Sequence, residues 1–157
     1  MEYADSKELE TKSSKVFTVR TGEPSDATQI LTFARAVSAE DIYSLITLDE
    51  FTFTDEQEIA WLQQMKEKPG SLVIVAELEG EIVGMLDFTS GHRKRIAHTG
   101  DFGMSVGKAY REDGIGRAML ESLIAWVSAH PTLEKINLKV HSTNSRAISL
   151  YQKLGFI

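Results

Sequence analysis

Residues 111–118 read REDGIGRA and stand between a predicted strand and a predicted apolar helix. Gly114 and Gly116 would let the backbone approach a bulky anion, and the free N–H groups of the helix's first turn would point toward it. The alternative is a helix N-terminus whose glycines only make a turn. A P-loop is excluded because Gly-Lys-Ser/Thr is absent, and the dinucleotide fingerprint fails because Met119 stands where a third small residue is required.

Around this segment the chain alternates predicted strands and helices. Strands are predicted over Val16–Thr21, over Ser71–Leu78 and Glu81–Thr89 as a hairpin, over Thr99–Val106 and over Ile136–Val140. Helices are predicted after an N-cap at Ser25 or Asp26, after a capping box of Thr54 and Gln57, over Ile115–His130 and over Asn144–Leu154. A short helix over residues 42–48 and a loop over 49–53 complete the pattern.

The composition is that of an ordinary globular domain: 157 residues, of which 42% are hydrophobic and 25% charged. The formal net charge of −6 weighs against nucleic acids and anionic membranes as partners, and favours small cationic molecules or peptide amines. The absence of cysteine excludes disulfides, thiolate zinc sites and cysteine nucleophiles. No apolar stretch is long enough to span a bilayer and the N-terminus is no signal peptide, so we expect a cytoplasmic protein.

The first 14 residues differ from the rest of the chain because they are almost entirely polar. Such a segment cannot offset the entropy cost of ordering, so residues 1–14 are predicted to be a flexible tail. The alternative is that they extend the first strand. Residues 15–157 are predicted to form a single domain.

Other patterns carry less weight. Residues 103–107 match the Gly-x-Ser-x-Gly motif of serine hydrolases, but a nucleophile elbow needs a helix directly after Ser105. The four histidines share no ligand spacing, so no metal site is predicted. The basic run at 93–95 is typical of a solvated loop. The acidic residues between 49 and 58 are typical of a surface, and would also attract an amine.

Four pieces of the chain, taken in order, resemble the GCN5-related N-acetyltransferases over residues from about 16 to 157. They are the strand Asp101–Val106, the loop Tyr110-Arg111-x-x-Gly114-x-Gly116, the strand Ile136–Val140 and the helix pattern Asn144-x-x-Ala147-x-x-Leu150-Tyr151-x-Lys153-x-Gly155-Phe156. The resemblance implies an α/β fold with a mixed, mostly antiparallel central sheet and helices on both faces. It places acetyl-CoA in a cleft between two splayed strands.

The resemblance also nominates the residues that bind the cofactor. In the family, the Arg-x-x-Gly-x-Gly loop holds the coenzyme A pyrophosphate, the preceding strand lends backbone groups to the pantetheine, and the Asn and Tyr of the last helix contact the cofactor. The cofactor-binding residues expected here are Met104, Ser105, Val106, Arg111, Glu112, Asp113, Gly114, Ile115, Gly116, Arg117 and Asn144.

The implied reaction moves an acetyl group from acetyl-CoA to a primary amine of a small molecule or peptide, without a metal. Tyr151 is the expected proton donor to the leaving thiolate; the alternative is a core aromatic. Asp101 is the first candidate for the base, because some relatives carry a glutamate there; the alternative is an exposed strand-end aspartate. Backbone N–H near Met104 is expected to polarise the thioester carbonyl. The competing hypothesis is a coenzyme A-binding module or sensor without turnover.

The chain departs from the family pattern in three places. Glu112 replaces a frequent glycine and stands beside Asp113, so both carboxylates would repel a pyrophosphate unless their side chains point to solvent. Lys108 replaces a frequent proline. The chain ends at Ile157, where the family continues into one or two strands. We therefore expect a C-terminally truncated domain whose last strand has an exposed edge, either within a longer protein or in a homodimer.

Overall fold

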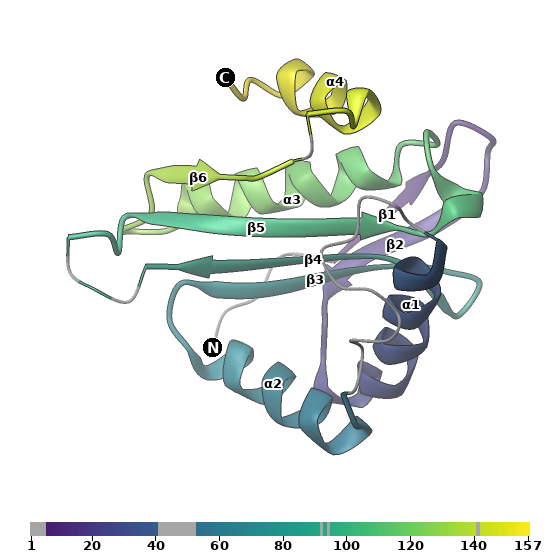
Figure 1. Ribbon diagram of the computed structural model, residues 1–157, viewed down its shortest axis with the longest axis horizontal. Helices are drawn as coiled ribbons and strands as arrows, with labels where there is room; N and C mark the ends of the chain where they lie inside the picture. Colours follow the sequence, from purple (N-terminus) through teal and green to yellow (C-terminus); the bar gives the residue numbers. More distant parts are fainter. Residues whose placement is uncertain (1–5, 41–52, 92, 94, 141) are drawn as a thin grey trace.

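In the described part of the chain, six strands form one sheet whose spatial order follows the sequence (Figure 1). The computed structural model describes residues 6–40, 53–91, 93, 95–140 and 142–157. Neighbouring strands are antiparallel except the last two, which are parallel. The predicted mixed, mostly antiparallel sheet is confirmed. The strands are β1 (Lys7–Glu10), β2 (Val16–Thr21), β3 (Ser71–Leu78), β4 (Glu81–Ser90), β5 (Thr99–Val106) and β6 (Lys135–Asn137).

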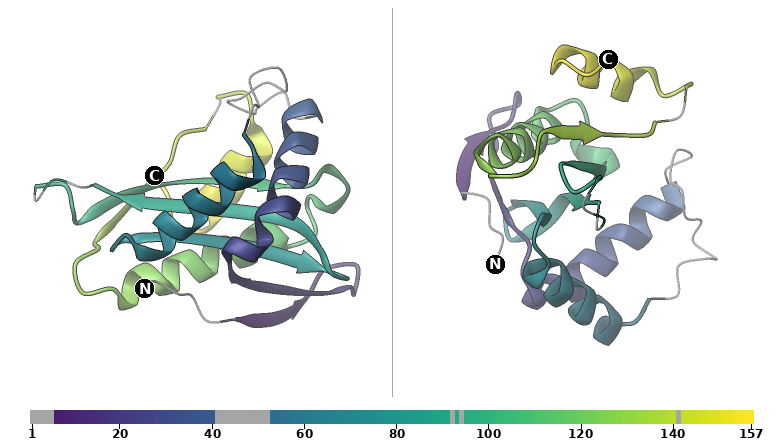
Figure 2. Two further views of the ribbon diagram at one scale, coloured as in Figure 1. Left: turned by 90° about the horizontal axis from the view of Figure 1, so that it is seen from below. Right: turned by 90° about the vertical axis from the view of Figure 1, so that its left-hand side faces the viewer.

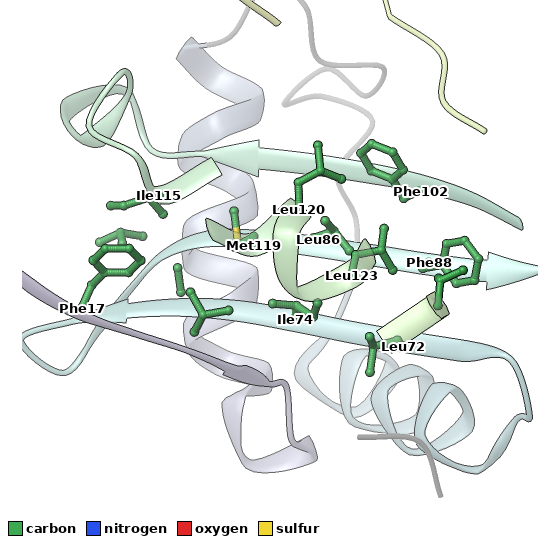
Figure 3. Close-up of a cluster of buried hydrophobic side chains, with 14 of the residues drawn as sticks. Phe17, Leu72, Ile74, Leu86, Phe88, Phe102, Ile115, Met119, Leu120 and Leu123 are labelled. Atoms are coloured by element: carbon green, nitrogen blue, oxygen red, sulfur yellow. The ribbon is translucent and has the colours of Figure 1, made fainter. Parts of the chain in front are cut away.

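Helices cover both faces of the sheet, as Figures 1 and 2 show. One face carries α1 (Ala27–Glu40) and α2 (Asp55–Glu67), and the other carries α3 (Ile115–Ala129). The last helix, α4 (Ser145–Lys153), lies beyond β5 on the α3 side, where the ring of Tyr151 packs edge-on against Phe102 at 5.8 Å. The core beneath α3 is drawn in Figure 3 and includes Phe17, Leu72, Ile74, Leu86, Phe88, Met119, Leu120 and Leu123.

The central hairpin shows why the two faces form separate cores. β3 is apolar along most of its length, and alternation sends Leu72 and Ile74 toward α3 and Val73 and Val75 toward α1 and α2. The turn to β4 has positive φ at both central residues, 53° at Glu79 and 80° at Gly80, which suits the twist of a two-residue hairpin. The predicted hairpin is therefore confirmed.

The two helices on the first face begin differently. Thr54 and Gln57 form the predicted capping box at the start of α2. The predicted N-cap at Ser25 or Asp26 is wrong, because residues 24–26 form a 3-10 turn (η1) and α1 begins at Ala27. Asp26 is drawn into an ion pair with Arg20 at 2.8 Å, and its carboxylate also accepts the N–H of Glu23.

The N-terminal segment forms a strand over residues 7–10, where the sequence predicts a flexible tail. β1 pairs antiparallel with β2, and Leu9 packs against the main core. The turn that follows is closed by Thr11, which is only 5% exposed, bonds Ser13 through its hydroxyl and pairs with the backbone of Lys15. This mostly polar strand gains its order from ladder hydrogen bonds, from this turn and from the single apolar contact of Leu9.

Two further differences concern the end of the sheet and residues 41–52. β6 begins one residue earlier than predicted, at Lys135, and it is shorter than predicted. It is shorter because its pairing with β5 ends where Asp101 stands opposite Asn137. Beyond that register the two segments diverge, so residues 138–140 have no strand ladder. The predicted short helix at residues 42–48 and the acidic residues at 49 and 50 lie outside the described residues.

Candidate functional site

The parallel strands β5 and β6 separate after three paired positions. β6 accompanies β5 over Thr99–Asp101 and then leaves it, so within the described ranges the rest of that edge of β5 has no neighbouring strand. Peptide groups on such an edge can hydrogen-bond an extended ligand. The side chains of Met104 and Val106 face the α3 core, while Ser105 alternates to the other face. The structure thus places the three predicted strand residues at the opening.

A braced turn joins this edge to α3. The chain passes through a 3-10 turn (η3, Lys108–Tyr110), and Arg111 Nε–H donates back to the carbonyl of Val106 at 2.9 Å. Arg111 therefore fixes the end of β5 relative to the loop that follows. Arg117, also predicted to bind the cofactor, lies in the first turn of α3 and pairs with Glu121 at 2.8 Å on the exposed side of the helix.

The start of α3 has the features of an anion site. Gly114 is its N-cap with φ of 95°, and no side chain caps the helix. The first-turn N–H groups of residues 115–117 therefore have no capping side chain, and the helix dipole favours negative charge there. A Cβ added at Gly114 would meet no atom within 4 Å, so the space beside this N-cap is open. The residues present fit a pyrophosphate.

Gly116 has a different position from Gly114. A Cβ added at Gly116 would lie 3.4 Å from Met104 Cε and 3.5 Å from Val106 Cγ2. This glycine lets α3 lie close against β5, and so holds the helix N-terminus next to the opening between β5 and β6. The sequence assigns both glycines to the approach of an anion, whereas the structure adds a packing role for the second.

The loop before α3 carries two neighbouring acidic residues, Glu112 and Asp113, and the carboxylate of Asp113 is bonded to the N-terminal segment. Asp113 accepts the N–H of Ser13 at 2.9 Å and its hydroxyl at 2.6 Å, and its own carbonyl accepts the N–H of Lys12 at 3.0 Å. The two bonds from Ser13 to the carboxylate, the hydroxyl bond above all, hold the pKa of Asp113 below its ordinary value. Glu112 is exposed and has φ of 61°, a left-handed conformation that explains why glycine suits this position.

The contact between Ser13 and Asp113 predicts a measurable effect of Ser13→Ala. Removing the hydroxyl deletes one of the two bonds to the carboxylate, so the pKa of Asp113 should rise toward its ordinary value. Because that pKa is lowered in the folded state, the bond stabilises the folded state fully at pH values above the ordinary pKa near 3.8. This stabilisation is lost as the pH falls through the lowered pKa. Carboxyl-carbon NMR titration measures the shift. Ser128→Ala, at an exposed hydroxyl on α3, should leave it unchanged.

Two predicted residues lie on α4. Asn144 is the N-cap of the helix, and its Oδ1 accepts the N–H of Ala147 at 3.3 Å, which leaves the amide nitrogen for another partner. The half-buried ring of Tyr151 contacts Phe102 at 5.8 Å and Phe156 at 6.0 Å. Burial raises the pKa of the Tyr151 phenol, so it keeps its proton at neutral pH. The predicted donor is thus also part of an aromatic cluster.

The candidate base lies on the other face of the same strand. Asp101 is exposed and stands between Thr89 of β4 and Asn137 of β6 in the sheet register. Alternation directs Asp101 toward the α1 and α2 side, while Phe102, which touches Tyr151, faces α3. The expected base and the expected acid therefore approach β5 from opposite faces.

Two further acidic residues lie on the α1 and α2 side of the sheet, as Asp101 does. The sequence singles out Glu58 only as part of the acidic group between 49 and 58, and does not single out Asp87. Asp87 sits in the middle of β4, and burial raises its pKa. Glu58 on α2 is 9% exposed, and burial followed by the nearby Asp87 raises its pKa. The sequence could have pointed to Asp87, because an aspartate is unusual inside an otherwise apolar central strand.

Several alternatives raised by the sequence are tested by the same geometry. Ser105 lies inside β5 and is followed by η3 rather than by a helix of full length, so no nucleophile elbow forms. Among the described residues, no three histidine or acidic side chains are grouped as metal ligands. None of the helices that the structure describes is long and apolar enough to cross a membrane.

Known proteins share both the sequence pattern and the fold. A family model described as the acetyltransferase (GNAT) family matches residues 39–156. L-amino acid N-acetyltransferase AaaT of Escherichia coli (strain K12) is 30% identical over 96 residues, 61% of this chain and 59% of that protein. The chain therefore spans less than two thirds of that relative.

Solved structures agree. An acetyltransferase of the GNAT family from Streptococcus pneumoniae superimposes with a TM-score of 0.87 and 33% identity, over 90% of this chain and 84% of that one. The structure of yncA from Salmonella typhimurium with its cofactor acetyl-CoA gives a TM-score of 0.77 at 21% identity, over 89% of this chain and 79% of that one. The latter likeness concerns the fold alone.

This mixed sheet, which splits between two parallel strands beside a helix N-terminus without a capping side chain, matches the acyl-CoA N-acyltransferase fold of the similar GNAT structures. With the family model matching most of its length, this chain belongs to the GNAT acetyltransferase family.

Proposed function

We propose that this protein transfers an acetyl group from acetyl-CoA to a primary amine of a small molecule or peptide. The observation that carries the proposal is the divergence of β5 and β6 directly beside the N-terminus of α3. The free edge of β5 suits an extended amide-containing arm, and the helix N-terminus suits a pyrophosphate. Family membership and the N-acetyltransferase relatives support the same reaction.

The residues of β5 and α3 would hold acetyl-CoA, which supplies an activated thioester when bound. Peptide groups at Met104, Ser105 and Val106 would bond the pantetheine arm. The N–H groups of residues 115–117 would bond the pyrophosphate, and Asn144 would contact the cofactor through its amide nitrogen. A peptide N–H near Met104 would stabilise the oxyanion that forms on the thioester carbonyl.

Two protons must move for the amine to be acetylated. An ammonium group is not a nucleophile, so Asp101 would take a proton from it on the α1 and α2 side of β5, directly or through water. The leaving thiolate needs a proton, which Tyr151 would donate from the α3 and α4 side. The second proton that the nitrogen loses as the amide forms would return to the Tyr151 oxygen through water. Burial holds the pKa of Tyr151 above its ordinary value, which keeps the donor protonated.

The first test of this function is stabilisation by acetyl-CoA. A ligand that binds only the folded state, at a hundredfold excess over its dissociation constant, stabilises by about 2.7 kcal/mol. We expect a thermal shift with acetyl-CoA and none with NAD or ATP, because the loop lacks both nucleotide fingerprints. An equal shift with NAD contradicts the proposal.

Turnover separates an enzyme from a binding module. Thiol release in the presence of a panel of primary amines is the expected result. Stabilisation by acetyl-CoA without thiol release from any amine would instead favour a coenzyme A-binding module or sensor.

A further inference from the structure

A partly buried carboxylate lies beside a glycine of β5, next to the proposed acetyl-transfer position. Asp87 of β4 pairs in register with Gly103 of β5. A Cβ added at Gly103 would lie 3.4 Å from Asp87 Oδ1, so the carboxylate shares a face with this glycine. The next residue of β5 is Met104, whose backbone the proposed function places at the thioester. The absence of a side chain at Gly103 leaves Asp87 uncovered from the β5 side.

A second carboxylate meets the first from α2. Glu58 is 9% exposed, and its carboxylate has no hydrogen bond or ion pair among the residues that the structure describes. Asp87 is close enough to raise the pKa of Glu58, and both pKa values are raised chiefly by burial. α2 is held over this part of β4, where Thr89 Oγ1 lies 3.9 Å from the sulfur of Met65. Burying acidic groups without a partner is costly, and such groups gather at functional sites.

The cations on the neighbouring elements are engaged elsewhere. Lys66, one turn beyond Met65 on α2, pairs with Glu23 at 2.6 Å. Arg20 of β2 is shared between Asp26 and Glu77 at 2.8 and 2.7 Å. In the part of the chain described here, neither of these two cations forms an ion pair with Asp87 or Glu58.

Asp101 extends the acidic surface along β5. It lies two residues from Gly103 on the same face, so Asp87 and Asp101 are diagonal neighbours about 7–8 Å apart. A ligand whose amine reaches Met104 from this face therefore passes three carboxylates. That surface attracts an ammonium group and repels a carboxylate bonded to the same carbon as the amine.

We propose that Asp87 and Glu58 bind the amino group of an acceptor that carries no carboxylate beside the reacting amine. Peptide N-termini, amino sugars and simple diamines have an amine without a carboxylate beside it, whereas free α-amino acids carry a carboxylate on the same carbon. The inference rests on the proposed function, since it names the acceptor class for the same site. It also separates this chain from its relative that acts on L-amino acids.

The decisive comparison is L-alaninamide against L-alanine, which differ only in the carboxylate. At equal concentrations of unprotonated amine, we expect alaninamide to be acetylated at least about tenfold faster in kcat/KM. A dipeptide amide, glucosamine and 1,3-diaminopropane then show which source of amine fits best. Equal use of alanine and alaninamide overturns the proposal.

Variants assign the preference to the two residues. Asp87→Asn and Glu58→Gln should bring the alaninamide-to-alanine ratio close to one, mainly through a higher KM for the amide. The matched controls are Glu81→Gln, exposed on the same strand, and Glu67→Gln, exposed on the same helix, and both should keep the ratio. A ratio unchanged in Asp87→Asn and Glu58→Gln also overturns the proposal.

A binding measurement keeps the proposal testable without turnover. Titration of alaninamide hydrochloride, with and without coenzyme A, should shift the carboxyl-carbon NMR signals of Asp87 and Glu58. N-acetylalaninamide has no cationic group and should not shift them. Absence of any shift with alaninamide contradicts this inference, whereas failure of the proposed function is seen separately, as the lack of stabilisation by acetyl-CoA.

Discussion

Tyr151→Phe is expected to lower turnover by about 10²–10⁴-fold while leaving the affinity for acetyl-CoA unchanged. The substitution removes one hydroxyl and keeps the ring that contacts Phe102 and Phe156 at 5.8 and 6.0 Å. Packing and the position of α4 are therefore retained, and only the proton donor is lost. The measurement is thiol release under saturating acetyl-CoA, together with a thermal shift to report binding.

The matched control for this variant is Tyr110→Phe. Tyr110 lies in η3, close to the loop before α3, where Lys15 Nζ stands 6.0 Å from its ring centroid. Loss of the Tyr110 hydroxyl should leave turnover near the wild-type rate. If Tyr151→Phe also turns over at the wild-type rate, Tyr151 serves packing alone and the thiolate takes its proton from elsewhere.

The parts of the fold that could be predicted from sequence are those set by local pattern. The hairpin of β3 and β4, the strand β5 and the helix α3 follow from alternation, turn residues and helical spacing within short windows. The capping box at Thr54 is likewise local. These elements also place the loop and its glycines correctly, because strand, loop and helix are consecutive in the chain.

The parts that could not be predicted depend on contacts between distant segments. Ser13 and Asp113 are 100 residues apart, and no local pattern in a polar N-terminal segment indicates that its turn bonds a loop before α3. The short pairing of β6 depends on where it diverges from β5, which the alternating apolar and polar residues at 136–140 do not encode. The pKa of Asp87 is raised because folding takes its carboxylate partly out of water, and Glu58 of α2 lies near it, so its environment is a property of the packed structure.

Gly114→Val is expected to remove binding of acetyl-CoA. A branched side chain at this N-cap would extend into the open space at the start of α3, where a Cβ meets no protein atom within 4 Å, and would crowd a pyrophosphate bound at the first-turn N–H groups. Hydrogen bonds to charged groups contribute about 1.5–3 kcal/mol each, so losing two of them weakens binding by at least about a hundredfold. Isothermal titration with acetyl-CoA measures the loss.

The substitution also strains the backbone, because φ is 95° at Gly114 and left-handed geometry costs a branched residue about 1–2 kcal/mol. Gly80→Val carries the same penalty as a matched control: φ is 80°, a Cβ there also meets nothing within 4 Å, and the residue lies in the turn between β3 and β4. Both variants should lose similar stability, whereas only Gly114→Val should lose acetyl-CoA. If both bind acetyl-CoA normally while folded, the N-terminus of α3 is not the pyrophosphate site. If both lose it equally, the effect belongs to stability rather than to the loop.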